Sequence, residues 1–408
     1  MRNRVSIPRL RVRVRSGART RPTPGWDATW WVGPEWQLRG AGEAHRMSLA
    51  GDDQAGRAAG VCAALAAHSR VEGDGLEQAG IHLPLVFGSL GFDADTDGVL
   101  IVPRRVEVSW RGHVWLVDQE VDGAAEGPLA PCDSAGVPSP GRVRVTAGSV
   151  SDSDYLERLS RLIVDLREGR ARKVVIARDV IAQAERPVHP AWLAERLHEA
   201  YPTCWTYAID GLVGATPEML AEVHDGRVHV RVLAGTAGRD EGEQLLASRK
   251  DRLEHDIAVA SVRESLAPLA TNLSVPDQPQ VLTLPNVTHL SSTIRGDVSV
   301  TSLQAAGALH PTAAVCGSPT RVAKRMIRAL EGGSRGRYAA PVGWMDARGN
   351  GQWGIALRCG QIDPKDPRRV RVIAGGGIMP DSDPTRELLE TEAKMRPVLA
   401  ALGVPDHG

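Results

Sequence analysis

The hydrophobic pattern of the chain changes character near residue 150. Before that point, apolar and alternating runs indicate strands, including residues 99–103 and a hairpin over residues 106–117 that turns at Arg111-Gly112. After it, segments with helical spacing and apolar strands follow one another. Because hairpins predominate and strict strand–helix–strand alternation is absent, we predict an α+β fold of mostly antiparallel sheets packed with outer helices.

The second part of the chain gives the clearest helix boundaries. One helix should stop at Gly169, a typical residue beyond a helix C-terminus. Asp383 and Pro384 predict the start of the last helix, which Gly403 follows and which Pro397 should kink or interrupt. The predicted helices are 152–168, 190–200, 242–268, 302–309 and 320–331, and the predicted strands are 173–177, 206–209, 219–223, 227–233, 338–344, 352–360 and 369–374.

The first 25 residues contain eight arginines and no acidic residue. Residues 10–15 alternate between apolar residues and arginine, which predicts a short strand. We otherwise expect residues 1–25 to be a mobile or edge-strand extension, with a nucleic-acid arm or a targeting peptide as the alternatives. Residues 26–408 should form a single catalytic domain, with a strand-rich, variable part over about 27–150 and a motif-bearing part over about 151–408.

Composition argues against several classes of protein. The 408-residue chain has a formal net charge of zero, which does not favour a nucleic-acid binder. It lacks both a run of eighteen apolar residues and a signal-peptide pattern, so we expect no membrane span and no secretion. The five cysteines form no CxxC pair, which suits a reducing cytoplasm and argues against a structural zinc site.

Lysine is rare, with five among the 49 basic Lys and Arg residues. Lys394 shares one face of the last helix with Glu387 and Glu390, and a solvated face with a Glu390–Lys394 ion pair is the simplest interpretation. The preceding run 375–377 is all glycine, and we interpret it as a turn that exposes backbone N–H groups to an anion. Carboxylates without Cys or His partners suit Mg²⁺.

Three further positions are candidates for chemistry. Lys173 heads an apolar strand, and a lysine in a closed pocket is driven towards the neutral amine, which is a general base. Glu218 follows a Thr-Pro turn beside apolar residues that favour a protonated acid. Glu254 offers another carboxylate within a charged helix. On this evidence alone, a solvated surface position remains the alternative for each residue.

The order of these segments resembles the chorismate-utilising enzymes, which include isochorismate synthase, salicylate synthase and the large subunit of anthranilate synthase. The resemblance covers about residues 155–400 in collinear order. The matching motifs are Lys-Val-Val-Ile-Ala-Arg (173–178), Gly-Ala-Thr-Pro-Glu-Met-Leu (214–220), Leu-Ala-Gly-Thr-Ala-Gly-Arg (233–239), Lys-Asp-Arg-Leu-Glu-His (250–255), Val-Thr-His-Leu-Ser-Ser (287–292), the segment 309–319, Arg-Gly-Arg-Tyr-Ala-Ala-Pro-Val-Gly-Trp (335–344), Ile-Ala-Leu-Arg-Cys (355–359) and the closing segment 374–394.

The resemblance implies a role for each matching residue. Glu254 and Glu390 match the Mg²⁺ ligands of the family, and Glu387 should lie near the metal. Lys173 matches the base that activates water for attack at C2 of chorismate, and Glu218 matches the acid that protonates the departing C4 hydroxyl. The substrate-binding positions that the resemblance implies are Gly235, Thr236, His289, Ala314, Tyr338, Arg358, Gly375, Gly376 and Lys394.

Within the family, the resemblance favours an isochorismate synthase, an isomerase that we expect to be monomeric and to need no glutaminase subunit. Lys173 favours water over ammonia as the nucleophile, and Ala234 stands where aminodeoxychorismate synthases tend to carry a lysine. The segment 310–315 looks like the isochorismate synthase form, although Ala313 replaces the usual proline and Ala340 a common glycine. Salicylate synthase is the alternative, and an anthranilate-type aminase or a non-catalytic anion-binding homologue agrees less well. The sequence leaves open a menaquinone or a siderophore pathway.

Overall fold

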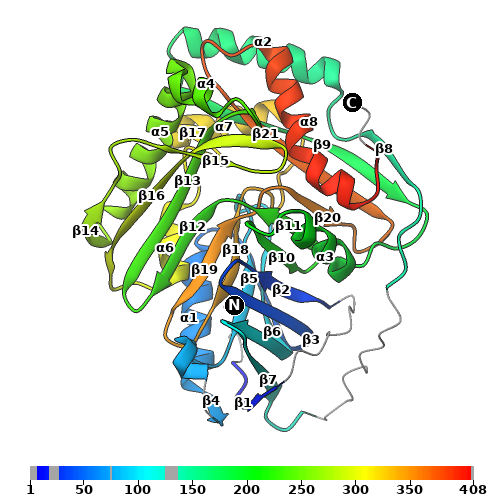
Figure 1. Ribbon diagram of the computed structural model, residues 1–408, viewed down its shortest axis with the longest axis vertical. Helices are drawn as coiled ribbons and strands as arrows, with labels where there is room; N and C mark the ends of the chain where they lie inside the picture. Colours follow the sequence, from blue (N-terminus) through cyan, green and yellow to red (C-terminus); the bar gives the residue numbers. More distant parts are fainter. Residues whose placement is uncertain (1–6, 18–26, 74–75, 125–136, 406–408) are drawn as a thin grey trace.

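The computed structural model describes residues 7–17, 27–73, 76–124 and 137–405 (Figure 1). Within these ranges the strands form one continuous hydrogen-bonded network, and its strand pairs are antiparallel except for β1 and β4. The strands are β1 (Leu10–Ser16), β2 (Thr29–Val32), β3 (Trp36–Leu49), β4 (Ser69–Glu72), β5 (Val86–Ser89), β6 (Gly98–Trp110), β7 (His113–Val121), β8 (Val143–Ala147), β9 (Lys173–Ala184), β10 (Trp205–Ile209), β11 (Leu212–Thr216), β12 (Met219–His224), β13 (Arg227–Gly238), β14 (Ala270–Ser274), β15 (Gln280–Thr283), β16 (Val287–Val298), β17 (Gly317–Ser318), β18 (Pro341–Met345), β19 (Gly351–Ile355), β20 (Cys359–Ile362) and β21 (Arg369–Ile378).

The helices pack against this network from outside, as the α+β prediction requires (Figure 1). The pattern of buried residues on α2 repeats the helical spacing of the sequence, and the side chain of Ser151 caps the helix by accepting from the Asp154 N–H. Asp383 caps α8 in the same way, and Pro384 occupies its first turn. The helices are α1 (Gln54–Ala67), α2 (Asp152–Arg167), α3 (Pro190–Ala200), α4 (Gly242–Ala247), α5 (Arg249–Leu266), α6 (Ser302–Leu309), α7 (Thr320–Leu330) and α8 (Pro384–Ala401), with a 3-10 turn at Leu76–Ala79.

The amino-terminal region is built on long hairpins. β6 and β7 form the predicted hairpin about Arg111-Gly112, and the predicted strand 99–103 is the first half of β6. Residues 10–16 form the predicted short strand, but β1 lies between β4 and β7. The expectation of a mobile or edge-strand extension is therefore wrong for these residues, while residues 1–6 and 18–25 lie outside the described ranges.

Two arms of the network meet where the functional motifs lie. One arm runs β9–β21–β20–β11, and the other runs β12–β13–β16, with β19 also paired to β12. The chain passes from one arm to the other between β11 and β12, at the residues Pro217 and Glu218. This junction places Glu218 between strands of both arms.

Several predicted boundaries differ from the structure. The long helix is two helices, α4 and α5, because Ser248 is extended and its side chain caps α5. The strand 352–360 is interrupted because Arg358 adopts a left-handed backbone with φ of 48°. The residues 375–377 continue strand β21 rather than forming a turn, since each pairs with β9. Pro397 does not interrupt α8, which runs through it to Ala401, and the alternative of a kink at Pro397 stays a prediction.

Two further features concern the apolarity of the helices and the state of the cysteines. Among the described residues, no helix has both the length and the apolarity needed to cross a lipid bilayer. The cysteines that the structure describes, Cys62, Cys204, Cys316 and Cys359, are buried free thiols.

Candidate active site

One cavity at the junction of the two arms collects most of the predicted site residues. Its floor and walls come from β9, β13, β16, α5, β21 and α8. The segments before β12, β17 and β18 and the segment after β19 complete the lining. The predicted residues that line it are Glu218, Gly235, Thr236, Glu254, His289, Ala314, Tyr338, Arg358, Gly375 and Lys394. Lys173, Gly376, Glu387 and Glu390 do not line it and lie directly behind this wall.

The glycines of β21 explain how charged side chains approach the sheet so closely. A Cβ atom at Gly377 would lie 2.3 Å from Glu254 Oε1 and 2.7 Å from Lys173 Cε. At Gly376, a Cβ atom would lie 3.0 Å from Glu387 Oε2 and 3.7 Å from an oxygen of Glu390. These positions need glycine because glutamate and lysine side chains occupy the space of a side chain.

Each of the three site glutamates is paired with its own lysine. Lys173 Nζ lies 2.9 Å from Glu254 Oε1, and Lys250 Nζ donates to Glu387 Oε1 at 3.0 Å. Lys394 pairs with Glu390 and also donates to the Gly375 carbonyl at 3.0 Å. Three of the five lysines of the chain therefore meet three carboxylates in one region.

The environment moves the pKa values of these carboxyls in opposite directions. Burial alone would raise the pKa of Glu254, but the ammonium groups of Lys173, Lys394 and Lys250 hold it below its usual value. Burial and the neighbouring carboxylate of Glu390 raise the pKa of Glu387 to about 7. Glu254 is therefore an anion at neutral pH, whereas Glu387 takes up a proton more readily.

Glu218 occupies the drier side of the cavity. It is 4% exposed, and its Oε1 accepts one weak hydrogen bond, from the Leu233 N–H at 3.4 Å. Burial raises its pKa to about 7, although Leu233 N–H, Lys173 and Arg358 oppose the shift. The charge of Lys173 therefore acts on Glu218 and favours its ionised form. A carboxyl poised near neutral pH is suited to donate a proton.

His289 and Arg358 form a fixed pair of polar groups in the cavity. Arg358 Nη2 lies 2.9 Å from His289 Nε2, and His289 Nδ1 lies 3.2 Å from the Gly235 carbonyl. Since guanidinium only donates and a carbonyl only accepts, Nε2 carries the lone pair and Nδ1 the proton. Burial and Arg358 hold the pKa of His289 well below its ordinary value, so this ring is neutral.

Backbone geometry brings these groups into the cavity. Gly235 has φ of 75° and lies at a register shift between β13 and β16, where a bulge turns the strand. Arg358, 8% exposed, lies in the left-handed break between β19 and β20. Both irregularities lie at the cavity, consistent with backbone that is shaped for a ligand rather than for regular pairing.

The carboxylates beside the cavity have the chemistry of Mg²⁺ ligands. Glu254, Glu387 and Glu390 supply carboxylate oxygens, which is the donor chemistry that Mg²⁺ prefers. As the side chains stand, no cluster of three acidic, His or Cys groups in the described parts of the chain is close enough to hold an ion. The ion pairs with lysine account for that spacing, because each glutamate turns towards an ammonium. The residue types fit the metal, and the ion pairs would have to open.

Sequence reasoning missed one charged residue of this region. Lys250 pairs with Glu387, yet the motif that contains it, 250–255, was used for Glu254 alone. The rarity of lysine was the signal that would have found it. The cavity also has apolar walls that no motif indicated, from Val175, Pro217, Leu233, Val315 and Leu357.

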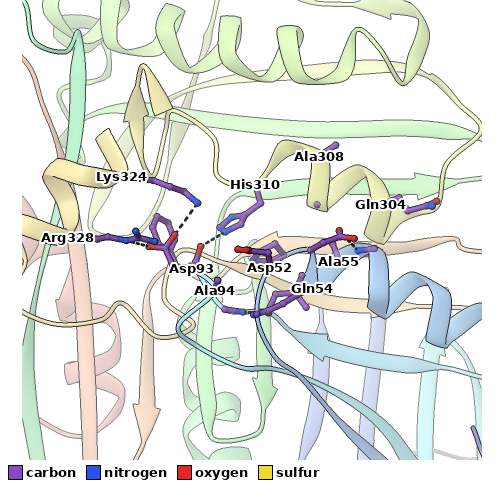
Figure 2. Close-up of a pocket in the computed structure, with 18 residues that line it drawn as sticks. Asp52, Gln54, Ala55, Asp93, Ala94, Gln304, Ala308, His310, Lys324 and Arg328 are labelled. Atoms are coloured by element: carbon purple, nitrogen blue, oxygen red, sulfur yellow. Dashed lines mark hydrogen bonds and ion pairs between the residues drawn. The ribbon is translucent and has the colours of Figure 1, made fainter. Parts of the chain in front are cut away.

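A larger pocket, of about 490 Å³, lies elsewhere, and it contains none of the predicted site residues (Figure 2). It lies between the start of α1, the loop after β5 and helices α6 and α7, and His310 and Lys324 are among its lining residues. The narrower cavity at the junction is the functional candidate, because the buried acid and the site carboxylates converge there.

Comparisons with known proteins show the family to which the chain belongs. A family model described as "Chorismate binding enzyme" matches residues 133–403. The putative isochorismate synthase MenF of Mycobacterium tuberculosis (strain H37Rv) is 37% identical over 345 residues, which is 79% of this chain and 87% of that protein. The isochorismate synthase DhbC of Bacillus subtilis is 32% identical over 355 residues, 81% of this chain and 83% of that protein.

Solved structures share the fold over most of the chain. The putative 2,3-dihydroxybenzoate-specific isochorismate synthase DhbC of Bacillus anthracis superposes with a TM-score of 0.77 at 26% identity, over 93% of this chain and 97% of that one. The menaquinone-specific isochorismate synthase MenF of Escherichia coli gives a TM-score of 0.77 at 22% identity, over 97% and 95% of the two chains. The second likeness concerns the fold alone.

Proposed function

Because the chain belongs to the family of chorismate-binding enzymes, we propose that it converts chorismate to isochorismate in a Mg²⁺-dependent reaction. The observation that carries the proposal is a cavity lined by two glutamates, the protonatable Glu218 and Glu254, whose carboxylate pairs with Lys173 behind the wall. The relatives named above as isochorismate synthases support the choice of product.

In the proposed reaction, Lys173 and Glu218 divide the proton transfers. The neutral amine of Lys173 takes a proton from a water molecule as its oxygen bonds to C2 of chorismate. The ring double bonds shift, the C4–O bond breaks, and the Glu218 carboxyl protonates the departing hydroxyl, which leaves as water. One water enters and one leaves, so substrate and product are isomers.

The remaining polar groups hold the substrate. Chorismate carries two carboxylates, and Arg358 and Lys394 supply cations at the cavity wall, with the Tyr338 hydroxyl as a further donor. In the proposal, Glu254 and Glu390 bind Mg²⁺ and Glu387 lies near it. Bound there, Mg²⁺ would supply positive charge for a substrate carboxylate and for the charge that develops on the ring. The neutral His289, held by Arg358, lines the ring site.

Glu254 connects the base with the proposed metal site. Its carboxylate pairs with Lys173 at 2.9 Å, and it is also a proposed ligand. An ammonium held by a carboxylate cannot accept a proton, so the pair must loosen before Lys173 acts as a base. Both roles of Glu254 can be served only if its carboxylate turns from the lysine towards the metal.

The proposal is tested by incubating the protein with chorismate, with and without Mg²⁺, and separating the products by chromatography. Isochorismate that forms with Mg²⁺ and not after chelation supports it. Salicylate with pyruvate would instead identify a salicylate synthase, the second candidate, which makes the same intermediate. A requirement for ammonium in turnover would indicate an aminase.

The proposal extends to the setting of the enzyme. We propose a cytoplasmic monomer that works without a glutaminase subunit, since water and not ammonia is the nucleophile. A menaquinone-specific and a dihydroxybenzoate-specific isochorismate synthase both share the fold, so the proposal stops at isochorismate. Size-exclusion chromatography with light scattering checks the oligomeric state.

A further inference from the structure

The strand that begins with Lys173 has a gap along one edge. β21 pairs with β9 along one side, from Val174 to Gln183. On the other side, β17 pairs with Lys173 and Val174, and β8 pairs only from Val180 onwards. Among the described residues, no strand is paired with residues 175–179 on this edge, although the Val175 N–H donates to the Cys316 carbonyl at 2.9 Å. The remaining backbone groups would be costly to bury there without partners.

A buried ion pair occupies this gap in place of a strand. The Ala177 N–H donates to Glu331 Oε1 at 2.8 Å, and Arg335 Nη2 donates to the Val175 carbonyl at 2.8 Å. Arg335 Nε also donates to Glu331 Oε2 at 2.9 Å, so the two side chains hold each other in place. The side chains of Glu331 and Arg335 are only 5% and 3% exposed. The pair thus makes the contacts that a neighbouring strand would otherwise make.

The same arginine reaches a second wall of the cavity. Arg335 Nη1 donates to the Val315 carbonyl at 2.7 Å, and Val315 follows Ala314, which lines the cavity with it. Val175, two residues after Lys173, lines the cavity too. One guanidinium therefore joins the strand of the proposed base to the segment that faces the ring site.

The helix before the pair is tied to the amino-terminal region. Asp93 forms ion pairs with Lys324 at 3.1 Å and with Arg328 at 3.3 Å, both on α7, as Figure 2 shows. The Arg335 guanidinium lies over the Phe92 ring at 4.4 Å. These contacts fix the end of α7, and with it the position from which Glu331 and Arg335 reach β9.

We propose that the Glu331–Arg335 pair is a positioning device for the reaction, which sets the distance between Lys173 and the Ala314 wall of the cavity. The inference rests on the proposed function for the role of Lys173. Neither side chain lines the cavity, so both act through the backbone groups that they hold. A pair that served only stability would not need to reach two separate cavity walls.

The chain offers a matched control on the same strand. Asp179 is a buried carboxylate of β9, 4% exposed, which pairs with Arg371 Nε at 2.6 Å and accepts from the Ser149 N–H at 2.8 Å. It lies farther along the strand than Ala177 and touches no wall of the cavity. An Asp179→Asn change therefore removes a comparable buried charge without loosening the start of β9.

The test compares Arg335→Lys, Glu331→Ala, Glu331→Gln and Asp179→Asn by steady-state kinetics and melting temperature. Arg335→Lys keeps the charge but loses the two-pronged contact with Val175 and Val315, and we expect kcat to fall by roughly 10- to 100-fold with KM for chorismate nearly unchanged. Glu331→Gln keeps an acceptor for the Ala177 N–H and should restore much of the activity that Glu331→Ala loses. Asp179→Asn should melt at a lower temperature and keep its kcat.

A second readout does not depend on turnover. The chain has five lysines, so ¹³Cε-lysine NMR gives a small set of signals, and a Lys173→Arg variant assigns the relevant one. We expect Arg335→Lys to move the Lys173 signal and Asp179→Asn to leave it in place. The inference is overturned if Arg335→Lys lowers only the melting temperature, with kcat and the Lys173 signal as in the wild type. A wild type that makes no isochorismate would refute the proposed function, and the Lys173 signal would still decide the positioning role.

Discussion

The two walls of the cavity hold buried carboxyls of opposite character. Glu218 and Glu254 both line it, yet burial raises the pKa of Glu218 to about 7, while lysines hold the pKa of Glu254 below its usual value. Glu218 has one weak backbone donor, and Glu254 has an ammonium at 2.9 Å. The difference teaches that burial alone does not decide protonation. The partner decides whether a buried glutamate is an acid or a fixed anion.

The two walls also differ in their surroundings, since one is charged and the other apolar. On the Glu254 side, three lysines and three glutamates balance one another in charge, and Glu254 and Lys394 line the cavity. On the Glu218 side, the apolar Pro217 and Leu233 line the cavity and keep the carboxyl dry. A dianionic substrate entering between the walls would meet cations and, in the proposal, a metal on one side, and a proton donor on the other.

The largest effect should follow removal of the proposed base. We expect Lys173→Ala to lower kcat by about 10²–10⁴-fold, the usual range for a general base. Steady-state kinetics with chorismate measures the loss, and Lys365→Ala, at an exposed lysine, is the matched control. Unchanged activity of the Lys173→Ala variant would contradict the role of Lys173 as the base. It would also contradict the comparison between the two walls of the cavity.

Loss of the acidic proton of Glu218, on the opposite wall, should also lower the rate of the reaction. Glu218→Gln keeps the size and the contact with the Leu233 N–H but cannot donate an acidic proton, and we expect kcat to fall by about 10²-fold or more. Glu264→Gln, at an exposed glutamate, serves as control. Equal activity of the Glu218→Gln variant and the wild type would contradict the role of this carboxyl as the acid.

The pH dependence of kcat/KM sharpens the comparison further. Glu218 donates in its protonated form, and its pKa is raised to about 7, so the active form prevails below that pH. As the pH rises through 7, the protonated fraction falls, and the rate should drop by about tenfold per unit on that limb. The Glu218→Gln variant should lack the limb. If kcat/KM of that variant falls at the same pH, the titrating group is not Glu218.

The smallest expected effect is the stabilisation by metal. Mg²⁺ at about 100 times its dissociation constant should stabilise the fold by about 2.7 kcal/mol if it binds the native site alone. Differential scanning calorimetry should show a higher melting temperature with Mg²⁺, and chelation should reverse it. Glu254→Gln should abolish most of the shift, and an equal shift in that variant would place the metal elsewhere.

Local chemistry could be predicted from the sequence where one residue decides a conformation. The cap at Asp383 and the hairpin at Arg111-Gly112 follow from local rules, and α2 follows from its apolar spacing. The run 375–377 could not be predicted correctly, because its glycines look like a turn until Glu254 and Lys173 are seen to fill the missing side-chain space. Non-local contacts, and not local preference, decide such positions.

The candidate site could be predicted from the sequence only in part. The charged candidates within the motifs could be named from the sequence, because the resemblance assigns a role to each matching position. The lysine partners of the glutamates were not, with the exception of Glu390 and Lys394, since Lys250 and Glu387 come together only across separate helices. The contacts of Arg335 with the backbone of β9 could not be predicted either, because they depend on where β8 and β17 end.

The most direct test of the account follows the oxygen atom that Lys173 is proposed to activate. The reaction is run with Mg²⁺ in ¹⁸O-enriched water, stopped at early conversion, and the isochorismate is analysed by mass spectrometry. The account predicts one ¹⁸O atom, in the new hydroxyl at C2, because water attacks there and the C4 hydroxyl leaves. Isochorismate without the label would show that the hydroxyl is transferred within the molecule and would contradict the division of roles between the two walls.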